Sequence, residues 1–215
     1  MGRFIFIDAV AALTVLVTWY FWFSRYNRRK GLSVIRWVQA ACAGRARVTG
    51  TRWKGSARLF AELRFPPHMF ERARVVVRLL PRSVPVSWAM SRWRKEKETL
   101  SFEADLDTAP RFHLEVHNHR WSGHNSKAIA SKNWVVSRPG PVVLTSRTRW
   151  ERELSPVISA LMASRERNFR TIRFSPLSPH LSATLEIESL PDQQAATGWL
   201  EALRELAAGA STSRQ

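Results

Sequence analysis

The stretch FIFIDAVAALTVLVTWYFWF, residues 4–23, decides the organisation of this 215-residue chain. It is an almost uninterrupted apolar run, and a helix of about 20 residues, rising ~1.5 Å per residue, spans the ~30 Å hydrocarbon core of a bilayer. Residues 4–23 are therefore predicted to form one transmembrane helix, preceded by a short flank at 1–3. Asp8 is the ionisable residue in the run, and we expect it to reach the outer headgroups rather than to pair within a helix bundle.

A cleaved signal peptide is the main alternative for an apolar run at the start of a chain. This run ends in the aromatic sequence Trp19-Tyr20-Phe21-Trp22-Phe23, which contains no pair of small residues of the kind that signal peptidase requires. We therefore expect the segment to remain attached to the protein.

The distribution of basic residues predicts the orientation of the span. Only Arg3 precedes it, whereas the following segment carries Arg25, Arg28, Arg29, Lys30 and Arg36. Because basic flanks stay in the cytoplasm, we expect the N-terminus outside and the rest of the chain in the cytoplasm, at a bacterial-type inner membrane. These five basic residues, with Trp19 and Trp22, are predicted to contact the membrane surface, where aromatic rings lie at headgroup level.

The rest of the chain fits one domain of ordinary size. The single Cys excludes an intrachain disulfide, which agrees with a reducing compartment. The net charge is +17, and the segment 25–98 alone holds 19 Lys and Arg against four acidic residues, or +15. Anionic headgroups attract such a segment by about 1 kcal/mol for each basic residue near the surface. Nucleic-acid phosphates attract the same charges, which leaves nucleic acid as a second, less favoured partner.

Periodicity predicts an α+β fold in the remainder. Residues 24–44 form a basic juxtamembrane segment in which 32–43 have the apolar spacing of an amphipathic helix, with Gly44 as its stop. Residues 45–208 are predicted to be a cytoplasmic α+β domain of mainly antiparallel sheet, and 209–215 a disordered tail. Strands are expected at 45–53, 56–65, 72–80, 85–93, 99–106, 111–119, 133–137, 141–147, 168–174 and 181–188. Two helices are expected in the C-terminal half, one from Pro156 to about Arg165 and one from Pro191 to just before Gly209.

Two patterns within this domain suggest surface contacts. Arg72, Arg74 and Arg78 alternate with apolar residues in the strand 72–80, so they share one face and predict a basic sheet face. The dipeptide Arg-Trp occurs at 36–37, 52–53, 92–93, 120–121 and 149–150. Exposed pairs of this kind would suit a lipid interface. Neighbours on a strand point to opposite faces, however, so we favour tryptophans that lie in the core of an arginine-rich chain.

A cluster of histidines is the one pattern that suggests metal chemistry. The sequence RFHLEVHNHRWSGH contains His113, His117, His119 and His124. On a strand the first three share a face with Glu115, and such a set can ligate a transition metal. We favour polar-face histidines that lie across from Glu103 and Asp105 of the preceding strand, since that arrangement needs no metal.

Motifs for other chemistry are missing from the sequence. It contains no Gly-rich phosphate loop, no G-x-S-x-G, no H-E-x-x-H and no C-x-x-C. We therefore expect no cofactor and no enzymatic activity. The predicted function is that of a binding or accessory module at the anionic membrane surface or on a membrane protein complex. A membrane-tethered nucleic-acid binder and a metal-dependent enzyme that uses the histidines are the two alternatives.

Overall fold

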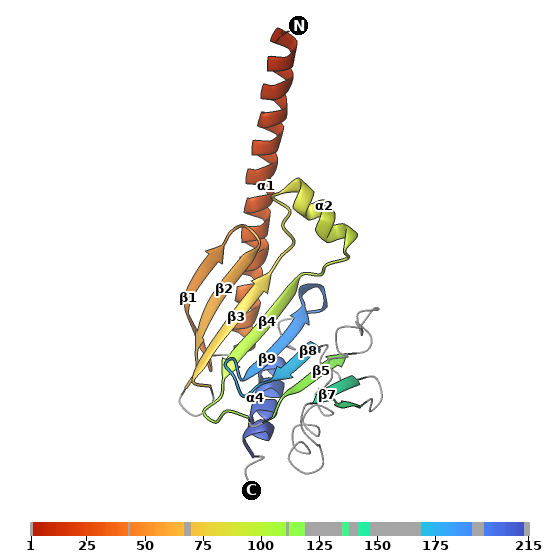
Figure 1. Cartoon of the computed structure of the whole chain (residues 1–215). Coiled ribbons are helices and arrows are strands. Elements are labelled where there is room, and N and C mark those ends of the chain that lie inside the picture. The colour runs from red at the N-terminus through yellow and green to blue at the C-terminus, as the bar shows by residue number, and fades with distance from the viewer. Residues whose placement is uncertain are drawn as a thin grey trace.

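The computed structural model of the chain describes residues 2–42, 44–66, 70–110, 112–118, 135–137, 142–146, 169–190 and 196–212. A long N-terminal helix leads into a domain that consists of one sheet with helices against one of its faces (Figure 1). The predicted α+β class, with one N-terminal apolar helix and an antiparallel sheet, is confirmed.

Helix α1 (Gly2–Cys42) is continuous over 41 residues. The predicted amphipathic helix at 32–43 is thus the second half of α1 and not a separate element. From Asn27 onward α1 buries one face, because Asn27, Gly31, Val34 and Val38 follow one another at three- or four-residue spacing. The helix ends at Cys42, and Gly44 just beyond it has a φ of 76°, the left-handed conformation that commonly follows a helix.

The described strands form one antiparallel sheet in the order β1-β2-β3-β4-β9-β8-β5-β7-β6. Each of the nine corresponds to a predicted strand, with ends that differ by a few residues. Their bounds are β1 (Arg47–Lys54), β2 (Arg58–Arg64), β3 (Arg72–Arg78), β4 (Thr99–Asp105), β5 (Leu114–Asn118), β6 (Val135–Ser137), β7 (Val142–Ser146), β8 (Phe169–Phe174) and β9 (Leu181–Glu186).

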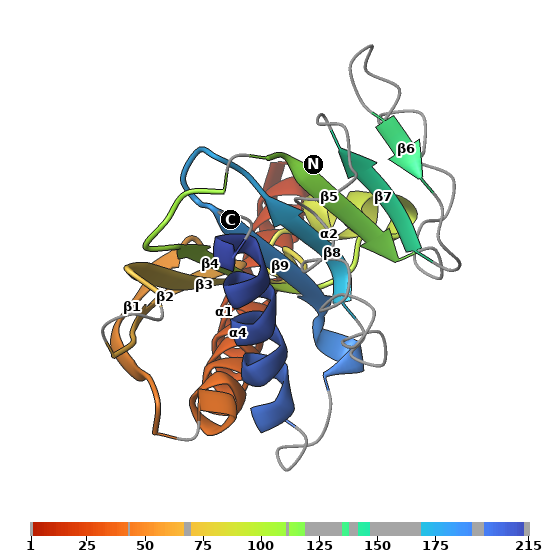
Figure 2. The ribbon, with the colours of Figure 1, turned by 90° about the horizontal axis from the view of Figure 1, so that it is seen from below.

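One face of the sheet forms the core. The alternating apolar residues of the central strands are buried there, as their spacing predicts: Leu100, Phe102 and Ala104 on β4, and Leu181, Ala183 and Leu185 on β9. The second half of α1 and helix α4 (Thr197–Thr212) lie side by side over this face (Figure 2). Trp37 of α1 meets Trp199 of α4, with ring centroids 5.6 Å apart. The opposite face carries the polar residues of the same strands.

Residues 85–93 were predicted to be a strand, and this prediction is wrong. They form helix α2 (Pro85–Trp93), which begins with Pro85 in its first turn. β3 pairs directly with β4, so that Arg78 lies opposite Thr99, and the sheet has no position for a strand between them. The connecting segment therefore folds as a helix at the end of the sheet (Figure 1).

The C-terminal helix also differs from its predicted bounds. α4 begins at Thr197, after a short 3₁₀ helix η2 (Ile187–Ser189), and continues to Thr212. It passes Gly209 and enters the predicted disordered tail because Leu203, Leu206 and Ala210 keep one apolar face on the core. The helix predicted at 156–165 lies outside the described residues.

Candidate membrane-facing site

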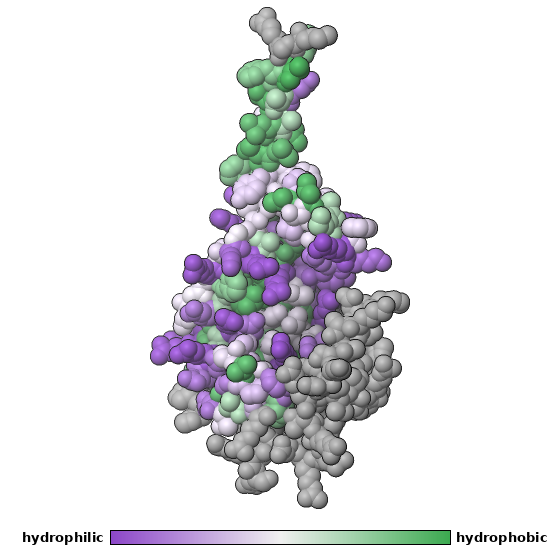
Figure 3. Space-filling model, in the orientation of Figure 1, coloured by the Kyte–Doolittle hydropathy of each residue, from purple (hydrophilic) through white to green (hydrophobic). Residues whose placement is uncertain are grey.

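The first half of α1 projects from the domain as an apolar rod (Figure 3). Large apolar side chains are exposed along it from Phe4 to Trp22. Within the described parts of the chain, α1 is the one helix that is long and apolar enough to cross a membrane. A helix that is apolar on all sides normally lies in a protein core or in lipid, and nothing in the described parts of the chain covers residues 4–18.

The domain first touches α1 at Trp19. The indole N–H of Trp19 donates a hydrogen bond of 2.9 Å to the carbonyl oxygen of Arg82. Its ring centroid lies 6.0 Å from that of Trp88 in α2 and 4.5 Å from that of Phe23. Trp19 precedes Phe23 by one helical turn, or ~6 Å along the axis. The loop at Arg82 and helix α2 thus reach the level of the last turn of the predicted span.

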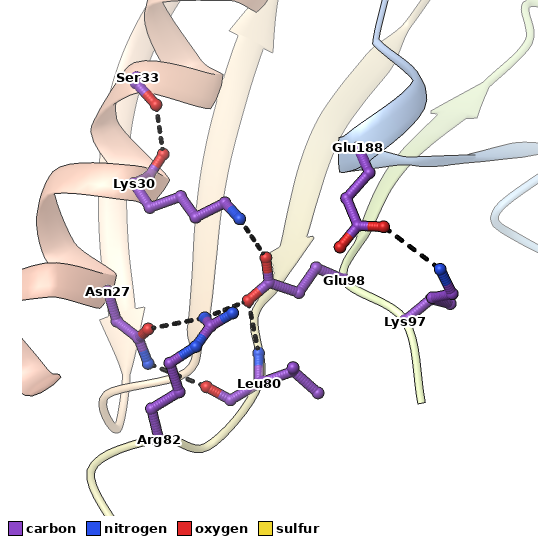
Figure 4. Close-up of polar contacts among 8 residues, drawn as sticks. All are labelled: Asn27, Lys30, Ser33, Leu80, Arg82, Lys97, Glu98 and Glu188. Atoms are coloured by element: carbon purple, nitrogen blue, oxygen red, sulfur yellow. Dashed lines mark hydrogen bonds and ion pairs between the residues drawn. The ribbon is translucent and has the colours of Figure 1, made fainter. Parts of the chain in front are cut away.

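Beyond Trp19, a buried polar cluster centred on Glu98 joins α1 to the sheet (Figure 4). The Nζ atom of Lys30 lies 2.6 Å from the carboxylate of Glu98, which also accepts a hydrogen bond from the guanidinium of Arg82. The backbone N–H of Leu80 donates to the same carboxylate over 3.1 Å. The side-chain amide of Asn27 donates to the carbonyl oxygen of Leu80 over 3.0 Å. This cluster holds α1 in one position on the domain.

The electrostatics of the cluster keep Glu98 ionised. Burial by itself raises the pKa of this carboxyl, but the hydrogen bonds from Lys30, the Leu80 N–H and Arg82 outweigh burial, so the net pKa lies below its ordinary value. Lys30 was predicted to be a surface anchor. Its ammonium is paired with the buried carboxylate of Glu98, and its side chain remains 26% exposed.

Unpaired cations gather at the end of the sheet from which α1 emerges. Lys54, Arg58 and Arg78 are exposed, and they lie directly across from one another on β1, β2 and β3. In the part of the chain that is described, none of the three forms an ion pair. Asn27 of α1 donates hydrogen bonds to the carbonyl oxygens of Ser56 and Leu80, which fixes this end of the sheet on the helix. Like charges directly opposite one another destabilise a sheet, and a bound anion would offset that cost.

The predicted surface residues on α1 differ in what they can reach. Trp22 and the basic residues Arg25, Arg28 and Arg29 are exposed, whereas Trp19 is half-buried against the domain. Arg36 is also exposed, but it lies ~20 Å beyond Phe23 along the helix axis. That distance exceeds the Debye length of ~8 Å at physiological salt, so headgroups at the level of Phe23 are screened from Arg36.

The predicted basic sheet face is basic mainly at one end. Arg72, Arg74 and Arg78 lie on the exposed face of β3. Arg74 forms an ion pair with Glu103, and Arg72 faces Asp105 in the register of β3 with β4. Arg78 faces an uncharged Thr. The acidic residues of β4 thus balance the end that is distant from the apolar half of α1, and the end from which that half emerges keeps its charge.

The histidines are arranged differently from the prediction. β5 pairs with β7 and β8, so its polar face does not lie across from Glu103 and Asp105 of β4. The side chains of His113, Glu115 and His117 are half-buried on that face. His117 Nε2 lies 3.3 Å from the carboxylate of Glu115, and this contact lowers the pKa of Glu115.

The proposed metal set is only partly described. His119 and His124 lie outside the described residues. Among the residues that are described, no group of three His, Cys, Asp or Glu side chains is arranged to hold a metal ion.

The Arg-Trp pairs do not act as one kind of unit. Trp37 is buried in the core and Trp53 is half-buried against it, whereas the side chain of Trp93 is 83% exposed. Trp121 and Trp150 lie outside the described residues.

Two parts of the site were missed in the sequence. Asn27, Arg82 and Glu98 are far apart in the chain and make no local pattern, so no sequence signal connects them. Helix α2 did carry a signal, because Val86, Met90 and Trp93 recur at helical spacing after Pro85.

No known protein family matches the sequence, and no curated protein is significantly similar to it.

Proposed function

We propose that this is a single-pass membrane protein, with its N-terminus outside and its basic domain on the cytoplasmic leaflet of a bacterial-type inner membrane. The domain binds anionic headgroups and serves there as a binding or accessory module, alone or on a membrane protein complex. The observation that carries the proposal is the row of unpaired cations, Lys54, Arg58 and Arg78, at the end of the domain where the apolar half of α1 emerges.

The continuity of α1 supports a permanent anchor rather than a cleaved leader. The apolar half runs without a break into the half that packs on the sheet. Trp19, within the predicted span, is hydrogen-bonded to Arg82 of the domain. Cleavage after Phe23 would remove this contact and the packing of Trp19 on Trp88.

The position of the free charge favours a lipid surface over nucleic acid. A nucleic acid on the open sheet face would lie over Glu62, Glu103 and Asp105 as well as over the arginines. A membrane that contains α1 meets only the end of the sheet, where described acidic groups are few and Glu98 is already neutralised by Lys30 and Arg82.

The fragment 24–215 allows a direct test, since it lacks the span but keeps all of α1 that packs on the sheet. We expect it to sediment with vesicles of phosphatidylcholine and phosphatidylglycerol at low salt, and to be released as the salt concentration rises. It should not bind vesicles of phosphatidylcholine alone. Equal binding to vesicles with and without phosphatidylglycerol would contradict the proposal.

The sheet offers a matched pair of triple variants for this assay. The first variant replaces the cation row with Gln, at Lys54, Arg58 and Arg78. The second variant makes the same replacement at the opposite end of the same three strands, at Arg47, Arg64 and Arg72. The two ends of β3 are ~20 Å apart, which is more than a Debye length. Near the surface each charge is worth about 1 kcal/mol, so the first variant should bind at least tenfold more weakly and the second nearly normally. Equal loss in both variants, with binding to DNA or RNA, would favour the nucleic-acid alternative.

A further inference from the structure

We propose that helix α2 is a second membrane contact, a short interfacial helix that inserts one apolar edge among the lipid headgroups beside α1. This inference rests on the proposed membrane anchoring by α1. It adds a second contact, which fixes the tilt of the domain on the bilayer.

The exposed edge of α2 is apolar in a regular way. Val86, Met90 and Trp93 are 73%, 46% and 83% exposed, and their spacing of four and three residues places them on one side of the helix. The opposite side, with Ser91 buried and Trp88 half-buried, packs on the domain. The apolar edge therefore points directly away from the protein. Adjoining exposed apolar side chains of this kind commonly mark a membrane or protein contact.

The contacts of α1 fix the level of α2. Trp88 of α2 packs against Trp19, and Trp19 lies ~6 Å before the end of the predicted span. If residues 4–23 fill the hydrocarbon core, α2 must lie at the boundary between acyl chains and headgroups. Interfacial helices are buried about 5–10 Å into this boundary, which agrees with that level.

The charges that flank α2 fit the same position. Arg92, Arg94 and Lys95 are exposed at its C-terminal end, and no acidic residue lies within the helix. Trp93 stands among them, and tryptophan is the side chain most typical of the water–lipid boundary. An apolar edge bordered by basic residues is the composition of a helix that lies on anionic lipid.

The bilayer is the occupant that the geometry favours, because the apolar edge lies at the end of the domain where the apolar half of α1 emerges. Figure 1 shows α2 running outward from α1 at the end of the domain where α1 emerges, and Figure 3 shows hydrophobic surface at the same end. Trp19 and Trp88 are in contact, so α2 lies beside the exposed half of α1.

Spin labels on single cysteines in the full-length protein test this inference. Cys42 is buried and is first replaced by Ala to give a cysteine-free background. Val86→Cys and Trp93→Cys are then labelled and reconstituted in nanodiscs of phosphatidylcholine and phosphatidylglycerol. Leu177→Cys is the matched control, because Leu177 is as exposed as Val86, at 73%, but lies near Asp105 at the other end of the sheet. The readout is the accessibility of each label to oxygen, which partitions into lipid, relative to a water-soluble nickel complex.

We expect the ratio of oxygen to nickel accessibility at positions 86 and 93 to exceed the ratio at 177 several-fold. Ratios equal to that at 177 would overturn the inference, as would protection of both positions from both reagents, which would indicate a protein partner on α2. A label at Leu13→Cys, in the middle of the span, separates this result from the proposed function. If position 13 is in lipid while 86 and 93 are in water, only the inference about α2 fails. If position 13 is also in water, the proposed anchoring fails.

Discussion

Glu98 shows how single residues position the long helix α1 on the domain. Its side chain is almost fully buried, and two cations with one backbone N–H compensate its charge. A buried carboxylate of this kind is costly to form but more costly to disrupt, because removal of one partner leaves the others buried without compensation. Lys30 and Arg82 come from α1 and from the loop before α2, so Glu98 links both elements to the sheet.

We predict that Glu98→Gln destabilises the domain by about 3 kcal/mol at neutral pH. The neutral amide cannot compensate two cations, and its NH₂ group faces donors. For a domain of this size about 3 kcal/mol lowers the Tm by about 6–12 °C, which thermal unfolding followed by circular dichroism in mild detergent will measure. Glu96→Gln, an exposed residue two positions earlier, is the control and should leave the Tm nearly unchanged.

The loss should also depend on pH. The folded pKa of Glu98 lies below its ordinary value of 4.5, so its stabilising effect is complete above about pH 4.5 and disappears as the pH falls through the folded pKa. The difference in Tm between Glu98→Gln and the native protein should therefore be largest near pH 7 and shrink in acid. A difference that stays constant down to pH 3 would show that the charge of Glu98 is not the cause.

At the scale of elements, the sequence predicts the type and the ends of a segment well where its apolar residues follow a single period. The alternation in β4 and β9 is strict, and both strands are present within two residues of their predicted ends. The segment 85–93 resembles a strand in the sequence because Val86, Trp88 and Met90 also alternate with other residues. Sequence alone cannot show that β3 and β4 are direct neighbours, and that pairing excludes a strand between them. Sequence alone also cannot show that β9 and β8 lie between β4 and β5 in the sheet.

Gly31 lies one position before the predicted start of the amphipathic helix at 32–43. A glycine after a run of basic residues resembles a break between two helices. In the structure it lies inside one helix, and a Cβ atom there would come within 2.6 Å of Trp53 Cη2 and 3.2 Å of Leu59 Cδ2. Gly31 is thus required for the close approach of α1 to β1 and β2.

We predict that Gly31→Ala lowers stability, although alanine is the better helix former by about 1 kcal/mol. The overlap with Trp53 costs about 1–3 kcal/mol, because the ring is packed against the core and moves only by exposing itself. In a Trp53→Leu background the overlap is removed, and Gly31→Ala should then raise the Tm. The two pairs of melting curves form a double-mutant cycle, and a rise in Tm in both backgrounds would refute the role given to Gly31.

At the scale of the whole molecule, charge and hydropathy follow the same axis. The apolar half of α1, the edge of α2 and the cation row of Lys54, Arg58 and Arg78 all lie at one end. Arg74, which is ion-paired with Glu103, and Arg72, which lies opposite Asp105, are distant from it. Strand pairing and the helix contacts bring these features together from segments that are separate in the sequence. The sequence alone therefore shows that the chain is basic, but not that its apolar and cationic surfaces gather at one end.

The same axis predicts the orientation of the protein in a cell. The flank that follows the predicted span is rich in arginine, and it continues into a domain whose cationic end lies beside the apolar half of α1, so we expect both to remain on the cytoplasmic side. In intact bacterial spheroplasts, added protease should leave a C-terminally tagged chain at full length, and lysis should expose its domain to digestion. A periplasmic protein of known location controls for access of the protease, and a cytoplasmic one for leakage. Digestion of the domain in intact spheroplasts would reverse the orientation, and it would place the cation row against the outer leaflet of the same membrane.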